Sequence, residues 1–422
     1  MRKLIGSLLQ VVFVAASRAM VSIATLVSVP IIITQAGMDF WVSAAVGQVV
    51  GEIGRSICVW GYGGRIAYLS SLPELIRLSF FRVSFWGRSL VSAVTIPLLL
   101  LVVAALTETH RDVALWMTLA GSLNGLGASW YFVATGQSRL LIALDAAPRA
   151  IGIVAGAFAL YALPGDAQGW GMGGMVALGS LFSVVIPTIL ILRLARTNGV
   201  QGAVVGEIRH SLVAGIPALV YSLCMTVRLS LPLTITAGIS SDNTAAVALA
   251  DKFVRWGNTG TSPLAEVIQA KVKDSGSSTV SRVRKTVLLS GCVSLVLAGT
   301  ITILVPRLST LVSVGEVTLR FGESSAIAVC ISGAFMSSVT SLALVPLIGR
   351  KRITAWASMT SLLVVAILVY PLTTWFGPSG ALWSLAFGEF IVLSLTCAEI
   401  ARGLRFQKLS SRDDLPREVR SK

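Results

Sequence analysis

Charged side chains inside long apolar stretches are the residues of this sequence whose chemistry is most informative. The nine charges of this kind are Arg18, Arg55, Arg228, Lys252, Arg255, Glu52, Asp251, Glu266 and Glu389. A charge at the centre of a bilayer costs about 2.5 to 3.5 kcal/mol or more, so such residues are expected to face a protein partner or a water-filled cavity. Arginine donors match phosphate oxygens two at a time, and a lysine ammonium acts as a point charge. A cavity lined by these cations would suit an anionic ligand, with structural ion pairing and snorkelling to the interface as the alternatives.

Two of the acids have an arginine one helical turn further along. Glu52 precedes Arg55 by three residues and Asp251 precedes Arg255 by four, and side chains at these spacings lie on the same helix face. Arg55 is therefore expected to pair with Glu52. Because protonation of a membrane acid can break such a pair, Glu52, Asp251 and Glu389 are candidates for ion coupling, with a purely structural role as the alternative.

The sequence contains no pattern typical of catalysis or metal binding. Its five cysteines lie singly in separate apolar stretches, and its two histidines, His110 and His210, lie at the ends of such stretches. There is no G-x-x-x-x-G-K-[ST] loop for a nucleotide phosphate. We therefore expect no catalytic residue, no metal and no cofactor, and any transport would have to use an ion gradient.

Long apolar stretches must position these charges. A bilayer helix needs about 20 mostly apolar residues, and the hydrophobic residues make up 55% of the 422-residue chain. The predicted spans are 9–34, 40–61, 87–106, 112–134, 148–163, 171–192, 211–237, 243–268, 286–306, 324–347, 354–376 and 380–400. The expected fold class is all-α, a polytopic membrane protein with about twelve transmembrane helices.

Basic residues alternate between the connectors. Most of the 34 lysines and arginines lie in the two ends and in every second connector, and the opposite side has only Arg111, Arg307 and Arg320. Positively charged connectors stay in the cytoplasm, so both termini are predicted there. This bias also accounts for the net charge of +15, and no nucleic-acid partner is expected.

Matching residues suggest that the chain consists of two sets of six helices. Ser-Val-Pro at 28–30 has a counterpart in Ser-Leu-Pro at 230–232, and each half continues with a helix that contains one of the acid–arginine pairs. We predict an N-terminal lobe at 1–204, a C-terminal lobe at 205–405 and a cytoplasmic tail at 406–422. A substrate site would then lie between the lobes near the midplane.

Two segments resemble a known family. Trp130 and Phe132, followed by Gly136 and then Arg139 and Arg149, look like the aromatic connector between spans 4 and 5 of polysaccharide-repeat flippases. The sequence Ala-Asp-Lys-Phe-Val-Arg at 250–255 is similar to the A-D-K-hydrophobic-hydrophobic-R signature of their eighth helix. These are the Wzx-type O-antigen and exopolysaccharide flippases of the multidrug/oligosaccharidyl-lipid/polysaccharide exporter superfamily.

The resemblance implies a MATE-like fold of two lobes with pseudo-two-fold symmetry, in the inner membrane of a bacterium. It implies alternating-access transfer of undecaprenyl diphosphate-linked oligosaccharide repeat units to the outer leaflet, for O-antigen, capsule or exopolysaccharide synthesis, coupled to protons or sodium ions. The expected headgroup ligands are the five cations Arg18, Arg55, Arg228, Lys252 and Arg255. The implied partners are the lipid-linked glycan, membrane lipids, and a polysaccharide polymerase and chain-length regulator.

Two alternative functions remain open at this point. A multidrug or metabolite cation exporter of the same superfamily would share the fold, but its cavity is expected to be lined by acids and aromatic residues. A membrane polysaccharide polymerase or ligase would need acid–base residues and a large external loop, and the longest predicted outer connector is only about 17 residues, at 307–323.

Overall fold

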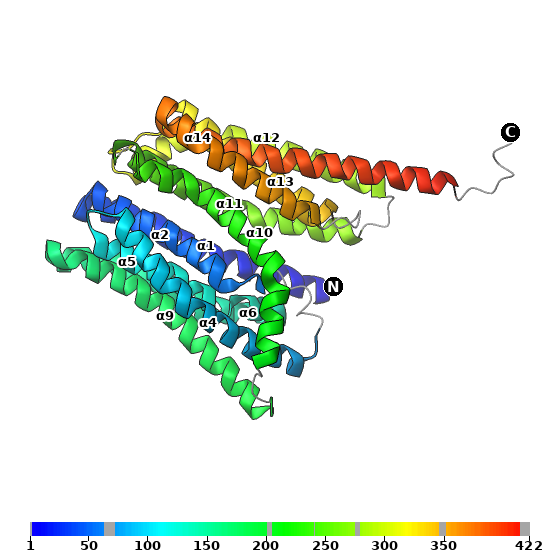
Figure 1. The fold of residues 1–422 in the computed structure, drawn as a ribbon, viewed down its shortest axis with the longest axis horizontal. Helices are drawn as coiled ribbons and strands as arrows, with labels where there is room; N and C mark the ends of the chain where they lie inside the picture. The colour runs from blue at the N-terminus through cyan, green and yellow to red at the C-terminus, as the bar shows by residue number, and fades with distance from the viewer. Residues whose placement is uncertain are drawn as a thin grey trace.

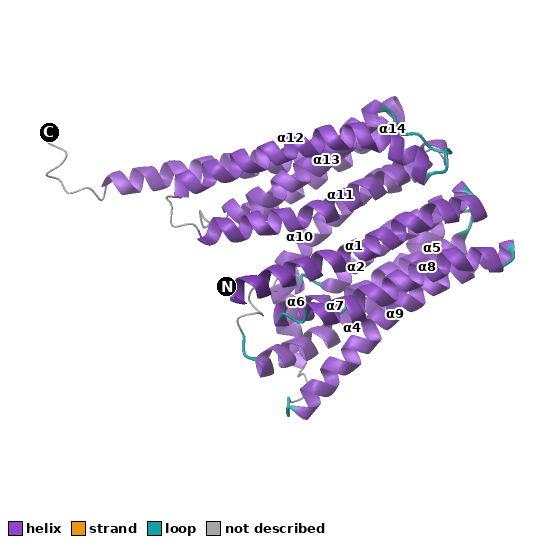
Figure 2. Cartoon of the chain, turned by 180° about the vertical axis from the view of Figure 1, so that it is seen from behind, coloured by secondary structure: helices purple, strands orange, loops and turns teal. Residues whose placement is uncertain are grey.

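Helices make up the described part of the chain. The structure is a computed structural model that describes residues 2–62, 72–200, 205–239, 241–274, 279–345 and 352–413. The elements are α1 (Arg2–Ala36), α2 (Met38–Val59), α4 (Glu74–Leu106), α5 (Arg111–Leu123), η2 (Asn124–Leu126), α6 (Ser129–Thr135), α7 (Ser138–Leu141), η3 (Ile142–Ala146), α8 (Ala147–Ala162), α9 (Gly165–Thr197), α10 (Val205–Ala237), α11 (Ser241–Asp274), α12 (Thr279–Val312), α13 (Phe321–Val339), η4 (Thr340–Leu344) and α14 (Arg352–Asp413). Figure 2 shows this all-helical architecture, which confirms the predicted fold class of a polytopic membrane protein.

Nine helices in the described residues are long and apolar enough to cross a bilayer, compared with the twelve predicted spans. One of the nine, Ile353–Leu404, is 52 residues long and contains the non-helical Gly377, where the predicted spans 354–376 and 380–400 meet. The predicted span 112–134 is interrupted: α5 ends at Leu123, and α6 begins only at Ser129. α11 is a continuous helix, but its charged and polar residues keep it below the hydropathy of the other spans.

Lipid-facing and protein-facing sides are separated clearly on α4. Leu90, Val94, Leu98 and Leu101 recur every three or four residues and are more than half exposed, as a helix face in contact with hydrocarbon requires. The opposite side of α4 includes Arg88, which is fully buried. This one helix therefore presents an apolar face outward and carries a charge inward.

Small residues allow α2 and α5 to approach closely. A Cβ atom placed on Gly51 would lie 3.0 Å from the Cα atom of Gly121, and one placed on Gly121 would lie 2.8 Å from the Cα of Gly51. Gly47 likewise faces the backbone of Ala114. Close packing through small residues is a main source of helix association in membranes, and here it fixes the helix that carries Glu52 and Arg55.

The described helices form two groups (Figure 1). One group contains α1, α2 and α4 to α9, and the other contains α11 to α14. α10 contacts helices of both groups, since it packs on α2 and α4 as well as on α11 and α14. The predicted lobe boundary at residue 204 falls in 201–204, outside the described residues, and the division into two six-helix lobes stays a prediction. The predicted tail at 406–422 begins as a helical continuation of α14 to Asp413, and 414–422 lie outside the described residues.

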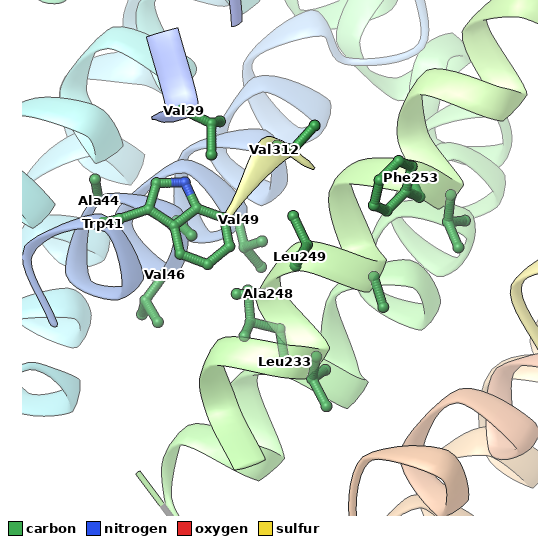
Figure 3. Packing of buried hydrophobic residues seen from close by; sticks show 14 of the residues in the cluster. Val29, Trp41, Ala44, Val46, Val49, Leu233, Ala248, Leu249, Phe253 and Val312 are labelled. Carbon is green, nitrogen blue, oxygen red and sulfur yellow. The ribbon is translucent and has the colours of Figure 1, made fainter. Parts of the chain in front are cut away.

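A buried apolar cluster joins the two groups at one end. It includes Trp41 and Val49 of α2, Leu249 of α11 and Val312 of α12, which lie close together in Figure 3. Its members on α1 lie in the second half of that helix, and those on α2 and α11 lie mostly in the first half, while α4, α5, α8, α9, α10, α12, α13 and α14 contribute further residues. Toward the opposite end, where α1 begins and α14 ends, the two groups of helices diverge (Figure 1).

Candidate functional site

A polar cleft lies between the two groups, beyond the apolar cluster. Its volume is about 610 Å³, and it is lined by the middle of α1, the second half of α2, residues of η2, α6, α7, η3 and α8, and α11. The cationic side chains that line it are Arg18, Arg55, Arg149, Lys252 and Arg255. Two acids, Glu52 and Asp145, also line it. Four of the five predicted headgroup ligands are thus brought together, and the described lining has an excess of positive charge.

Arg18 and Lys252 bridge the cleft. Arg18 of α1 donates a hydrogen bond of 2.8 Å from Nη1 to the hydroxyl oxygen of Ser262 on α11. The Nζ of Lys252 donates to the side-chain oxygen of Gln48 on α2. Lys252 is only 3% exposed, and its hydrogen-bond partner is a neutral amide. The Lys252 ammonium group therefore lines the cleft with a neutral hydrogen-bond partner, and an anionic ligand could take the place of that partner.

Two acid–arginine ion pairs lie on neighbouring cleft helices, and one of them is the predicted pair of Arg55 with Glu52. The Nη1 atom of Arg55 lies 3.1 Å from an Oε atom of Glu52, and the Nε atom of Arg255 lies 2.7 Å from an Oδ atom of Asp251. Arg255 also reaches Ser230 of α10, at 3.4 Å. Asp251 is buried, while about a fifth of the Arg255 side chain is exposed. Asp251 therefore holds the guanidinium group in place and leaves part of it facing the cleft.

A third pair, Asp145 with Arg149, was not among the predicted site residues. Asp145 lies in η3, a π-helical turn, and one of its Oδ atoms is 3.6 Å from the Nη1 atom of Arg149 on α8. In the sequence, Arg149 belongs to the segment that resembles the aromatic connector between spans 4 and 5. The spacing of four residues from an acid, as in 251 and 255, was the signal that could have identified it. π-helical turns are frequent at functional sites because they redirect side chains.

Arg228 and Glu389 do not lie in the cleft, which corrects their predicted placement in a shared cavity. Their side chains are 1% and 2% exposed, and Arg228 Nη2 lies 2.5 Å from Glu389 Oε1. Arg228 Nη1 also donates to Ser361 Oγ, at 2.8 Å. The partner that Arg228 lacked in the sequence is thus an acid 161 residues away. The side chain of Glu266, the remaining predicted cavity charge, lies outside the described residues.

The interruption between α5 and α6 shapes one wall of the cleft. Asn124, Gly127, Ser129 and Trp130 come from this segment and line the cleft. α6 ends at Thr135, and the next residue, Gly136, has a φ of +73°, the left-handed conformation that favours glycine. The aromatic connector of the sequence is therefore a short helix at the cleft wall.

Two apolar grooves adjoin the cleft at Trp256. One, of about 560 Å³, is lined by residues of α1, α11, α12 and α13, including Pro30 and Phe253. The other, of about 360 Å³, lies along α1 and α11 and includes Ile23. Trp256 lines both grooves and the cleft. The indole of Trp256 thus borders both the polar cleft and the two apolar grooves.

The described residues contain no group of three His, Cys, Asp or Glu side chains that could hold a metal ion. The chemistry of the site is that of charged and hydrogen-bonding side chains around a cleft. Such a site can bind an ionic group.

No protein-family model matches the sequence, and no curated protein matches it. Solved structures do match the fold. The MATE multidrug transporter DinF-BH, in complex with R6G, aligns with a TM-score of 0.64 at 15% identity over 92% of this chain and 94% of that one. The lipid II flippase MurJ in an inward closed conformation gives a TM-score of 0.61 at 11% identity, covering 93% of this chain and 87% of that one. A eukaryotic MATE transporter gives 0.57 at 9% identity over 93% of each chain.

Proposed function

The chain has the fold of the MATE transporters and of MurJ, and we propose that it is a secondary transporter that moves a lipid-linked anionic glycan across a bacterial inner membrane. The proposed substrate is an undecaprenyl diphosphate-linked oligosaccharide repeat unit, and the proposed pathway is O-antigen, capsule or exopolysaccharide synthesis. The observation that carries the proposal is that five cationic side chains line one cleft between the two groups of helices. They are Arg18, Arg55, Arg149, Lys252 and Arg255.

The charge of the cleft supports an anionic headgroup. Glu52, Asp145 and Asp251 each hold one arginine by an ion pair, while Lys252 is held by a neutral amide. A diphosphate adds the negative charge that this arrangement lacks, and it can accept the arginine donors that the carboxylates leave over. Lys252 and Arg255, one helical turn apart along α11, would contact it from one side, and Arg18 and Arg55 from the other.

The shape of the cleft supports a ligand with a long hydrocarbon chain. A polar headgroup in the cleft would have its chain in the apolar grooves beside Trp256, because burying a hydrocarbon chain among polar groups is unfavourable. With both termini in the cytoplasm, as the basic connectors predict, the cleft opens to the cytoplasm and the apolar cluster closes the periplasmic end. This is the orientation from which a substrate made at the inner leaflet would be loaded.

Flipping in proteoliposomes tests the proposal. The purified chain is reconstituted with a fluorescent undecaprenyl diphosphate oligosaccharide, and transfer between leaflets is followed with and without a proton or sodium gradient. We expect gradient-stimulated transfer, and we expect a Glu52→Gln or Asp251→Asn variant to lose the stimulation if that acid carries the coupling ion. Transfer that is equally fast in protein-free vesicles, or absent altogether, would refute the function.

Export of an organic cation is the second candidate, because the fold is also that of a multidrug transporter bound to R6G. Trp130 and Trp256 at the cleft would offer aromatic faces to a cation. The excess of arginine and lysine opposes this function, since like charges repel. Gradient-driven accumulation of a fluorescent organic cation, with no glycolipid transfer, would favour the exporter over the flippase. A polymerase and a chain-length regulator are proposed partners only for the flippase.

A further inference from the structure

Arg88 is a buried arginine that the proposed transport mechanism has not used. It lies on α4 and is 0% exposed, yet no described carboxylate forms a salt bridge with it. A buried charge without an opposite charge is costly, and such a residue is retained when its hydrogen bonds serve a purpose. Arg228, which is also fully buried, by contrast has an acid partner.

Two of the three acceptors of Arg88 are backbone carbonyls of the interruption between α5 and α6, and the third lies on α4 itself. Its Nη1 donates to the oxygens of Gly125 and Gly127, at 3.1 and 3.0 Å, and its Nε to the oxygen of Ser84, at 3.3 Å. Had α5 continued, the Gly125 carbonyl would have accepted a hydrogen bond from the amide four residues on. The guanidinium group thus replaces the helical hydrogen bonds lost between α5 and α6.

The same guanidinium group packs against aromatic rings. Its Cζ atom lies 5.6 Å from the ring centre of Trp130 and 5.8 Å from that of Tyr62. Trp130 and Gly127 both line the cleft, whereas Arg88 does not. Arg88 therefore lies directly behind the cleft wall and contacts two of the residues that form it.

The electrostatic consequence concerns the C-terminal end of α5. The free carbonyls at a helix C-terminus are equivalent to about half a negative charge, and a nearby cation offsets it. Without Arg88 this negative end would face a cleft whose proposed ligand is an anion.

We propose that Arg88 is a positioning residue for the cleft, which holds the interruption between α5 and α6 in place and neutralises the end of α5, so that an anionic headgroup can bind. The link to an anionic headgroup rests on the proposed function. The role of Arg88 in holding the interruption between α5 and α6 does not depend on that function. It predicts that a residue that never touches the substrate controls the apparent affinity for it.

Two measurements on three variants test this inference. Arg88→Met removes the charge and the donors, Arg88→Lys keeps the charge with fewer donors, and Arg82→Met is the matched control. Arg82 lies on the same helix and also donates to a backbone carbonyl, that of Val200, at 2.9 Å, but it does not line the cleft. The first measurement is hydrogen–deuterium exchange of the amides at 124–130, and the second is the concentration of glycolipid that half-saturates transfer.

For Arg88→Met we expect faster exchange at 124–130 and a rise of about tenfold in the half-saturating concentration, the equivalent of one charged hydrogen-bond contact. Arg88→Lys should recover most of the affinity, and Arg82→Met should change neither measurement. If the Arg88→Met protein is not recovered from the membrane, Arg88→Lys serves as the test. This variant should show a smaller increase in amide exchange at 124–130 and a smaller rise in the half-saturating glycolipid concentration.

The outcomes separate this inference from the proposed function. Unchanged exchange at 124–130 in the Arg88 variants would overturn the positioning role. Faster exchange with unchanged half-saturation, in a chain that transfers the glycolipid, would overturn the link to the headgroup. Faster exchange in a chain that transfers no glycolipid would support the positioning role while the proposed function fails.

Discussion

Two arginine–acid pairs within the membrane helices differ in their surroundings. Arg255 and Asp251 belong to one helix, and the arginine is about a fifth exposed to the cleft. Arg228 and Glu389 come from α10 and α14, and both are almost completely buried. Both pairs join an arginine to a carboxylate at a similar distance, but the arginine side chain is exposed to the cleft in only one of them.

This difference separates groups that can exchange partners from groups that cannot. Arg255 can turn a donor toward a ligand while Asp251 still holds it, because water already reaches the guanidinium group. If Arg228 moved away, Glu389 would stay buried without an opposite charge, which is strongly unfavourable. An arginine–acid pair with an exposed arginine thus suits the proposed ligand binding, while the fully buried pair attaches α10 to α14.

The largest effect is expected from breaking the buried pair. Arg228→Ala or Glu389→Ala should each destabilise the protein by about 3 to 5 kcal/mol, because the remaining charge is buried without an opposite charge. Thermal unfolding of the purified variants in detergent measures the loss, along with the amount of folded protein in the membrane.

The double variant Arg228→Met with Glu389→Leu sharpens this prediction. Replacing both members of a buried pair by apolar residues is often neutral, so the double variant should recover most of the lost stability. If the Arg228→Ala protein were as stable as wild type and lost only transport, the pair would belong to the transport mechanism instead.

A smaller effect, on transport and not on stability, is expected at Arg255. Arg255→Ala should raise the half-saturating glycolipid concentration by about 10- to 100-fold, the equivalent of one or two charged hydrogen bonds, and Arg255→Lys should recover only part of it because lysine lacks the planar donors. Flipping assays over a range of substrate concentrations give the comparison. Arg402→Ala is the control, since Arg402 pairs with Glu399 on its own helix at 3.4 Å but is 70% exposed and outside the cleft. Equal affinities for wild type and Arg255→Ala would contradict the headgroup site.

The same contrast explains which contacts could be predicted from the sequence. The pairs 52 with 55 and 251 with 255 follow from helix periodicity, which alone places their side chains together. The pair of Arg228 and Glu389 depends on how α10 packs against α14, and no local pattern encodes that packing. The sequence placed these residues inside spans, and only the fold shows that they meet.

The interrupted span shows a different reason for a missed feature. Apolar residues continue through 112–134, so hydropathy alone predicts one unbroken helix. The break at 124–128 leaves backbone carbonyls that would be unsatisfied in lipid, and the compensating group, Arg88, lies on another helix. Asn124, Gly125 and Gly127 were the only local signal of the break.

A substitution of Lys252 should weaken transport without lowering stability, whereas a substitution of Arg228 is expected mainly to lower stability. Lys252→Met removes a buried charge that is held by Gln48, a neutral partner, so the unfolding temperature should stay the same or rise. The half-saturating glycolipid concentration should rise about tenfold if the ammonium contacts the headgroup. Gln48→Ala is the control that keeps the charge. A destabilised Lys252→Met protein with normal affinity would assign Lys252 to the structure and not to the ligand.

The smallest effect is expected at Trp256, between the cleft and the apolar grooves. Trp256→Ala leaves every cation of the cleft in place, so affinity for a water-soluble diphosphate should change little. It removes apolar surface along the proposed path of the hydrocarbon chain, so affinity for a long-chain lipid should fall by a factor of about three to ten, at roughly 25 cal/mol per Å² of lost contact. The measurement is a comparison of the variant with wild type on two glycan diphosphates, one with the full polyprenyl chain and one with a short chain. An equal loss for both would place Trp256 at the headgroup, and no loss for either would show that the chain leaves the cleft elsewhere.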